Sequence, residues 1–173
     1  YCDFLLHTQQ IGVNKPIAFI SHAWKYKFLD VLDAIRNHYR NEDPVIWFDL
    51  FTNNQHGAPD LDFGWWTTTF KEAIRDIGTT VMVLSPWSNP IPLTRAWCLY
   101  EIYSTIDTNS VFEVALSSTE YNSLIHSIGE NINCIKDMLA IVNVQRSEAW
   151  NPLDKHRIFE IIEKTVGFDE VNL

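Results

Sequence analysis

The sequence predicts an α/β fold: a doubly wound parallel sheet of five strands with helices on both faces. Five short apolar runs recur along the chain, without the alternation of apolar and polar residues seen in strands that face water on one side. Segments with helical periodicity separate these runs, and this order is typical of parallel strands joined by right-handed crossovers. With 173 residues, 46% of them hydrophobic, the chain has the size of one domain, residues 1–173.

Each element is expected from a local pattern. The apolar runs predict strands at residues 16–21, 44–49, 79–85, 110–116 and 140–145. The helical patterns cover residues 26–39, 67–78, a segment that begins near Thr94, 117–139 with a break near Gly129, and 151–167. The apolar face of the first helix is expected to hold Phe28, Leu32, Ile35 and Tyr39. Gly78 and Gly167 are expected to end helices, and Asn151 followed by Pro152 is expected to begin one.

Composition limits the function classes. A formal net charge of −9 argues against nucleic acid as a partner, because basic groups supply most of that affinity. The apolar runs are far shorter than a membrane-spanning helix, so no membrane is expected as a partner. Cys2, Cys98 and Cys134 are odd in number and lack zinc spacing, which fits a reducing cytoplasm. Because Tyr1 begins the chain, we interpret it as a segment of a longer, multidomain protein.

Ligands of doubly wound sheets bind beyond the carboxyl ends of the strands, so the residues that follow each strand are the candidates for a site. Three candidates follow the first strand, one ends the second strand, and one begins the helix after the third strand. These residues are Ser21, His22, Trp24, Asp49 and Arg95. The turn after the first strand has no glycine-rich fingerprint, which argues against a Rossmann or P-loop phosphate site.

Glu101 is the single carboxylate in the apolar stretch "AWCLYEIY" of residues 96–103. Trp97 lies four residues before it, so both side chains share one face of the predicted helix. Leu99, Ile102, Tyr103 and Ile106 form an offset stripe that can pack on the sheet. Glu101 either points to solvent or faces a cleft at the strand ends, where partial burial would raise its pKa.

The polar stretch before residue 67 carries two further candidate groups. Asp60 and Asp62 could bind a hard cation, but two carboxylates are weak evidence, and we predict neither a metal site nor a bound cofactor. Phe63, Trp65 and Trp66 form an aromatic cluster in what reads as a loop. Exposed aromatic residues often anchor protein interfaces, so these three are the candidate interface; the other possibility is that the tryptophans tuck under the next helix.

The order of "FISHAW", "VIWFDL", "TTVMVLSPW" and "RAWCLYEI" resembles a Toll/interleukin-1 receptor (TIR) domain, and most closely the NAD-cleaving members of that family. The resemblance covers residues 16–107 and implies a flavodoxin-like fold. It implies that Glu101 is the catalytic carboxylate and that Trp97, Asp49 and residues 21–24 contact substrate. It also implies self-association through the loop after the second strand.

The resemblance implies NAD+ glycohydrolase activity, in which the nicotinamide–ribose bond is cleaved to give nicotinamide and ADP-ribose or a cyclic ADP-ribose, in signalling or defence. NAD+ is then a substrate, and a single carboxylate suffices because nicotinamide leaves without a proton. Two alternatives stay open at this point: a TIR-type adaptor that signals by self-association without turnover, and a nucleoside or nucleotide N-glycosidase.

Overall fold

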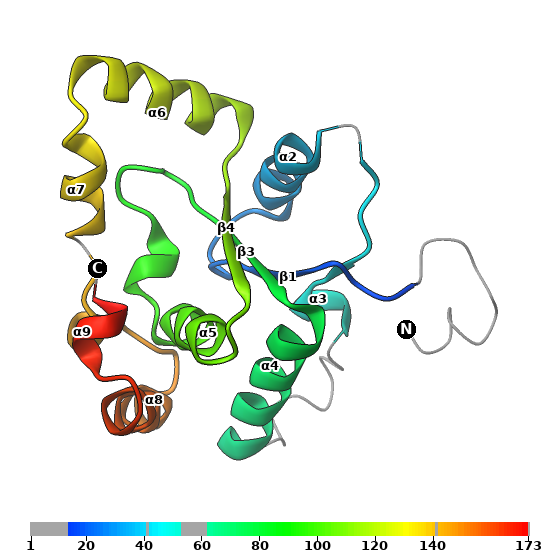
Figure 1. Ribbon diagram of the computed structural model, residues 1–173, viewed down its shortest axis with the longest axis vertical. Coiled ribbons are helices and arrows are strands. Elements are labelled where there is room, and N and C mark those ends of the chain that lie inside the picture. The colour runs from blue at the N-terminus through cyan, green and yellow to red at the C-terminus, as the bar shows by residue number, and fades with distance from the viewer. Residues whose placement is uncertain (1–13, 41, 53–61, 141, 173) are drawn as a thin grey trace.

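A computed structural model of the chain describes residues 14–40, 42–52, 62–140 and 142–172. Within them, four parallel strands form one sheet in the order β2-β1-β3-β4 (Figure 1). The strands are β1 (Ala18–Ser21), β2 (Ile46–Trp47), β3 (Thr79–Val83) and β4 (Val111–Ala115). The α/β class and the parallel sheet are therefore confirmed, but the expected strand count of five is wrong.

Helices connect and cover the strands. Their bounds are α2 (Phe28–Tyr39), α3 (Asp49–Thr52), α4 (Phe63–Ile77), η2 (Ile91–Thr94), α5 (Ala96–Asp107), α6 (Ser118–Glu130), α7 (Cys134–Leu139), η3 (Val144–Arg146), α8 (Pro152–Lys164) and α9 (Phe168–Val171). Helix α2 contacts β3 and β4, whereas α4 and α5 contact the sheet from its other face (Figure 1). Helices α8 and α9 pack outside α5, which makes α5 an interior helix.

The two central strands, β1 and β3, are buried on both faces, which explains why their sequences are apolar without alternation. The edge strand β4 is exposed over four of its five residues. In β1, Ala18 and Ile20 pack in the cluster that includes α2, while Phe19 packs in the cluster that includes α4 and α5. Ser21 is the last residue of β1 and lies two residues after Phe19, so its side chain points to the same face of the sheet; it is fully buried. The first strand thus directs a polar side chain toward α5 at its carboxyl end.

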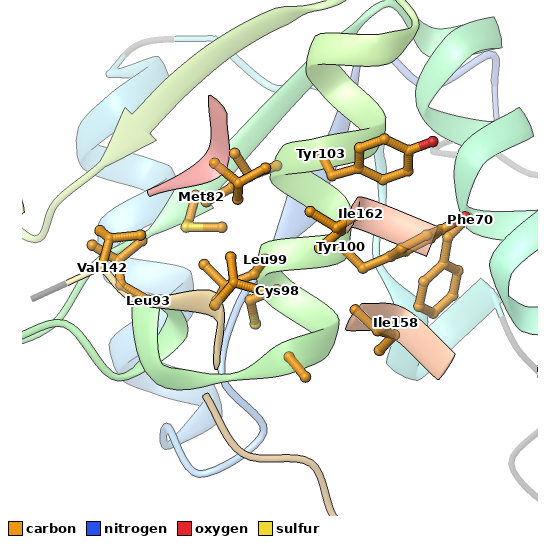
Figure 2. Packing of buried hydrophobic residues seen from close by; sticks show 14 of the residues in the cluster. Phe70, Met82, Leu93, Cys98, Leu99, Tyr100, Tyr103, Val142, Ile158 and Ile162 are labelled. Atoms are coloured by element: carbon orange, nitrogen blue, oxygen red, sulfur yellow. The ribbon is translucent and has the colours of Figure 1, made fainter. Parts of the chain in front are cut away.

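Helix α5 is central to the larger core. Figure 2 shows Cys98, Leu99, Tyr100 and Tyr103 of α5 among Phe70, Met82, Ile158 and Ile162, which come from α4, β3 and α8. Of the stripe expected to pack on the sheet, Leu99, Ile102 and Tyr103 are buried, but Ile106 is 43% exposed. Nine of the twelve residues of α5 are buried, and Glu101 is one of them.

The expected strand at residues 140–145 is not formed by the described part of this segment. Val142 and Val144 are both buried, which mimics a strand pattern, but residues 144–146 form the 3₁₀ helix η3. The Asn143 side chain caps this turn by accepting a hydrogen bond from Arg146 N. Further on, Glu148 forms a parallel bridge with Arg95, so the chain pairs with the start of α5 and not with β4.

Several element ends differ from those expected. Strand β2 is shorter, because Asp49 already begins α3. Of the apolar face expected for α2, Ile35 is buried and Tyr39 packs against the core, but Phe28 is 45% exposed. Val31 and Ala34, which were not expected on this face, are also buried. Thr94 ends η2, and Arg95 takes the N-cap position of α5.

Other expected ends are confirmed. Gly78 ends α4 with a positive φ of 84°, and its N–H bonds to Ile74 O. Asn151 caps α8 by accepting a hydrogen bond from Leu153 N, and Pro152 is the first helical residue. Residues 117–139 are helical, with an interruption between α6 and α7 shortly after Gly129. No helix in the described part of the chain has the length and apolar character needed to cross a membrane.

Candidate active site

Ser21 and Glu101 form a buried pair at the carboxyl end of β1. The Oγ atom of Ser21 donates a hydrogen bond to Oε2 of Glu101, which joins β1 to α5 across 80 residues of sequence. Ser21 is fully buried and Glu101 is 8% exposed. Because β1 lies between β2 and β3, its end is the point where chain connections diverge to the two sides of the sheet, which is where ligands of such sheets bind.

Burial dominates the electrostatics of Glu101. It raises the pKa of the Glu101 carboxyl to about 8; the Ser21 hydrogen bond opposes this rise and the negative charge of Asp49 adds to it. Burial also raises the pKa of the neighbouring Cys98 thiol, so this thiol is neutral and its Sγ lies 3.5 Å from His22 O. At neutral pH the free protein therefore holds Glu101 mainly in its protonated form.

Asp49 is the second carboxyl of the cluster, and Trp24, Leu50 and His22 are among the residues close to its oxygens. The indole Nε1 of Trp24 donates to Oδ2 at 2.6 Å, and Leu50 N donates to Oδ1 at 2.8 Å. His22 Nδ1 lies 3.9 Å from Oδ1, and burial lowers the pKa of His22 more strongly than the charge of Asp49 raises it. Asp49 is buried, whereas Trp24 is 70% exposed and lies at the surface of the cluster.

A cavity of about 150 Å³ adjoins this cluster. His22 and Trp24 line one part of it, and its other lining residues are Tyr26, Phe28, Val31, Phe48 and Leu50. The His22 ring stacks on Phe48 with centroids 4.6 Å apart. Glu101 does not belong to the lining, so a ligand that enters the cavity first meets aromatic and apolar side chains.

Trp97 occupies a different environment from the one expected. It is half-buried in the first turn of α5, and its ring contacts Phe63 at 5.5 Å and Phe70 at 5.7 Å, both from α4. The ring of Tyr100 lies 5.9 Å away. Trp97 therefore joins an aromatic cluster between α4 and α5, and these contacts give it a packing role.

The three aromatic residues expected in a loop lie in the first turn of α4. Asp62 caps this helix by accepting a hydrogen bond from Trp65 N at 2.6 Å. Phe63 and Trp66 are half-buried against the core, and Trp65 is 40% exposed. The loop placement was wrong, and Trp65 is the member of the three whose ring is most available to another molecule.

Arg95 lies at the start of α5 and is half-buried. Its backbone is held by the bridge to Glu148, and its positive charge lowers the pKa of Cys98 against the larger effect of burial. The guanidinium is thus close enough to influence the interior turn that carries Cys98 and Glu101.

The structure brings Ser21, His22, Trp24, Asp49 and Glu101 into one cluster. Sequence reasoning missed the aromatic lining of the adjoining cavity, above all Phe48, which stacks on His22. Its position directly before Asp49, at the end of the second strand, was the one sequence feature that could have marked Phe48 as a site residue. Tyr26 was also missed; its hydroxyl accepts a hydrogen bond from Ser85 N and ties the turn after β1 to the end of β3.

Metal binding finds no support among the described residues, where no group of three His, Cys, Asp or Glu side chains is arranged to hold an ion. Asp62 is engaged as a helix cap, and Asp60 lies outside the described residues.

Comparisons of the chain with protein-family models, with curated proteins and with solved structures gave no match.

Proposed function

We propose that the protein is a TIR-like domain with a flavodoxin-like fold that hydrolyses NAD+ at the nicotinamide–ribose bond. The observation that carries the proposal is the placement of Glu101: a buried carboxyl in the apolar part of α5, at the carboxyl end of β1 and hydrogen-bonded to Ser21. The strand order β2-β1-β3-β4 is compatible with a flavodoxin-like fold. The resemblance of "FISHAW", "VIWFDL" and "RAWCLYEI" to NAD-cleaving TIR domains supports the same assignment.

The chemistry needs one anion beside the ribose. As the bond from C1′ to the nicotinamide nitrogen lengthens, positive charge moves onto the ribose, and nicotinamide leaves as a neutral molecule. The ionised form of Glu101, held in a site with little water, stabilises that charge more strongly than a carboxylate in solution does. Water then adds at C1′ to give ADP-ribose, or a nucleophile of the adenine adds to give a cyclic product.

Substrate also supplies the charge that ionises Glu101. The nicotinamide ring of NAD+ is cationic, and a positive charge beside a carboxyl lowers its pKa. Binding of NAD+ near Glu101 therefore opposes the effect of burial, which raises the pKa of the free carboxyl to about 8. The proton is released when the Michaelis complex forms, and catalysis is expected to improve as the pH approaches 8.

Access to Glu101 requires a rearrangement, because this side chain is only 8% exposed. Trp24 is the suited mobile group, since it is 70% exposed and its polar atom has one hydrogen bond, to Asp49. When the indole swings away, Asp49 becomes accessible to the ribose of the substrate. Arg95, at the N-terminus of α5, provides positive charge for the diphosphate.

Self-association is the second part of the proposal. Trp65 exposes 40% of its surface at the start of α4, and its ring packs edge-on against Trp66, which is itself packed against the core. Contact between domains through this turn is expected to raise activity in a cytoplasmic signalling or defence assembly.

The test is product identification. The purified domain is incubated with NAD+ at low and high protein concentration, and nicotinamide, ADP-ribose and cyclic ADP-ribose are separated by chromatography. We expect nicotinamide in equal amount to the sum of the two ADP-ribose products. Absence of nicotinamide at all concentrations, from protein with a cooperative thermal melt, would refute the enzymatic assignment and favour the adaptor alternative.

A further inference from the structure

The turn after β1 directs successive side chains to the two faces of the sheet. Ser21 is directed toward α5, where it donates a hydrogen bond to Glu101. His22, the next residue, lies on the opposite face, where its ring stacks on Phe48 of the cluster that includes α2 (Figure 1). This alternation is usual for successive residues at the end of a strand. The carboxyl edge of the sheet therefore has one region around Glu101 and a second region beside α2.

The second region is the cavity of about 150 Å³, and aromatic rings form most of its lining. These rings belong to His22, Trp24, Tyr26, Phe28 and Phe48. Phe28 is 45% exposed and Trp24 is 70% exposed, so a ring that arrives from solvent meets flat apolar surfaces at once. Among the described residues the lining holds no lysine, arginine or carboxylate. These surroundings favour an uncharged planar ring, which gains free energy by stacking on aromatic side chains.

The size and place of the cavity indicate that it holds one end of a larger ligand. Pockets that enclose a whole ligand have volumes of at least about 300 Å³, twice the volume of this cavity. Glu101 is not part of the lining and lies on the other face of the sheet. A ring seated in the cavity is therefore remote from the carboxyl assigned to catalysis, and its own bonds do not react.

Asp49 and its neighbours connect the two regions along the carboxyl edge. In the chain Asp49 lies between Phe48 and Leu50, and both of these residues line the cavity. Trp24 and His22 also line the cavity, and they approach the Asp49 carboxyl at 2.6 Å and 3.9 Å. Asp49 is in turn near enough to Glu101 to affect its pKa. A ligand that extends over Asp49 reaches both regions, at the edge where doubly wound sheets bind dinucleotides.

We infer that the cavity beside α2 binds the adenine of NAD+, while the nicotinamide riboside lies on the α5 face beside Glu101. This inference rests on the proposed NAD+ cleavage and names the part of the substrate that the cavity recognises. Adenine is planar and uncharged, as the lining requires, and it takes no part in the reaction. The movement of Trp24 that exposes Asp49 also opens the passage between the two regions. Stacking of adenine then contributes binding free energy that positions the distant nicotinamide–ribose bond.

The experiment combines substrate truncation with a change in the lining. Nicotinamide release is measured with NAD+ and with nicotinamide mononucleotide, which lacks the adenine, and AMP binding is measured by calorimetry. Phe28→Ala should lower kcat/KM for NAD+ and the affinity for AMP by about 5- to 150-fold and leave cleavage of the mononucleotide unchanged. Leu50→Ala, a second change in the lining, should act in the same direction. Leu29→Ala is the matched control, because Leu29 is 72% exposed and is not part of the lining.

The outcomes separate this inference from the proposed function. A loss for NAD+ and AMP without a loss for the mononucleotide supports the adenine site. A loss by the same factor for both substrates overturns it, because adenine is then not the group that Phe28 contacts. AMP that does not bind to folded wild-type protein, or that binds equally to wild type and both lining variants, overturns it as well. If no substrate releases nicotinamide but AMP binding still depends on Phe28 and Leu50, NAD+ cleavage is refuted and the cavity remains an adenine site.

Discussion

Replacing Glu101 by glutamine should stabilise the folded protein at alkaline pH. The folded state raises the pKa of Glu101 from its ordinary value of 4.5 to about 8, so it holds a proton that the unfolded chain releases. This group contributes its full stability below pH 4.5, and the contribution is lost progressively as the pH rises to 8. Glutamine keeps the shape of the protonated carboxyl and its hydrogen bond with Ser21 but carries no ionisable proton.

The magnitude follows from the pKa. Each pH unit between 4.5 and 8 costs the wild-type protein about 1.4 kcal/mol of unfolding free energy relative to Glu101→Gln, or about 5 kcal/mol over the whole interval. At pH 7 the difference is about 3 kcal/mol, which corresponds to roughly 6–12 °C in the melting temperature of a domain of this size. Titrating groups that do not interact with Glu101 affect both proteins equally and cancel in the comparison.

Urea titrations and thermal melts of the two proteins at pH 5, 6, 7 and 8 measure this difference. The expected result is near equality at pH 5 and a growing advantage for Glu101→Gln toward pH 8. Glu72→Gln, at an exposed position of α4, is the matched control and should show no such divergence. A gap between wild type and Glu101→Gln that stays constant from pH 5 to pH 8 would refute the assignment of a buried, protonated Glu101.

The remaining predictions concern the neighbours of Glu101 and the aromatic clusters. Ser21→Ala removes a hydrogen bond that lowers the pKa of Glu101, so the midpoint of the pH–rate profile of NAD+ cleavage should move to higher pH. Asp49→Asn removes a charge that raises this pKa, so the same midpoint should move to lower pH. Trp97→Ala should cost about 3 kcal/mol of unfolding free energy, measured by urea titration, because three ring contacts are lost. Trp65→Ala should flatten the rise of specific activity with protein concentration and leave the melting temperature unchanged.

These predictions fail in distinct ways. Shifts of the same sign for Ser21→Ala and Asp49→Asn contradict the electrostatic account of Glu101. A Trp97→Ala variant of unchanged stability and reduced activity would place Trp97 at the substrate and not in the core. Trp66→Ala is the control for Trp65→Ala: Trp66 is half-buried, so its replacement should lower the melting temperature.

The candidate site could be predicted largely from the sequence, because two physical rules converge on it. The carboxyl ends of parallel strands lie at one edge of the sheet, where ligands bind, and this rule selected Ser21, His22 and Asp49. The presence of one carboxyl in the apolar stretch of residues 96–103 selected Glu101. Neither rule predicts the rotamer of an aromatic side chain. The structure was therefore needed to show that Trp97 packs against α4 and that Trp24 donates a hydrogen bond to Asp49.

The fold was less predictable where local patterns were ambiguous. Val142 and Val144 show the alternation of a strand, but the 3₁₀ helix η3 and the residues before it bury both side chains equally well. The bridge from Glu148 to Arg95 is a long-range contact, and no local sequence pattern predicts it. The start of α4 was missed because Gly64 and the polar residues before it read as a loop. Asp62 in fact caps the helix three residues before Trp65, and this capping signal was present in the sequence.

The most direct test of the central claim is the rate of nicotinamide release from NAD+ by wild-type protein and by Glu101→Gln at pH 8, with Glu72→Gln as the control. The account predicts that wild type and Glu72→Gln release nicotinamide at equal rates. It predicts that Glu101→Gln, which melts cooperatively at an equal or higher temperature, is slower by at least about 10²-fold in kcat. A folded Glu101→Gln protein that releases nicotinamide at the wild-type rate would contradict the claim that Glu101 is the catalytic carboxylate.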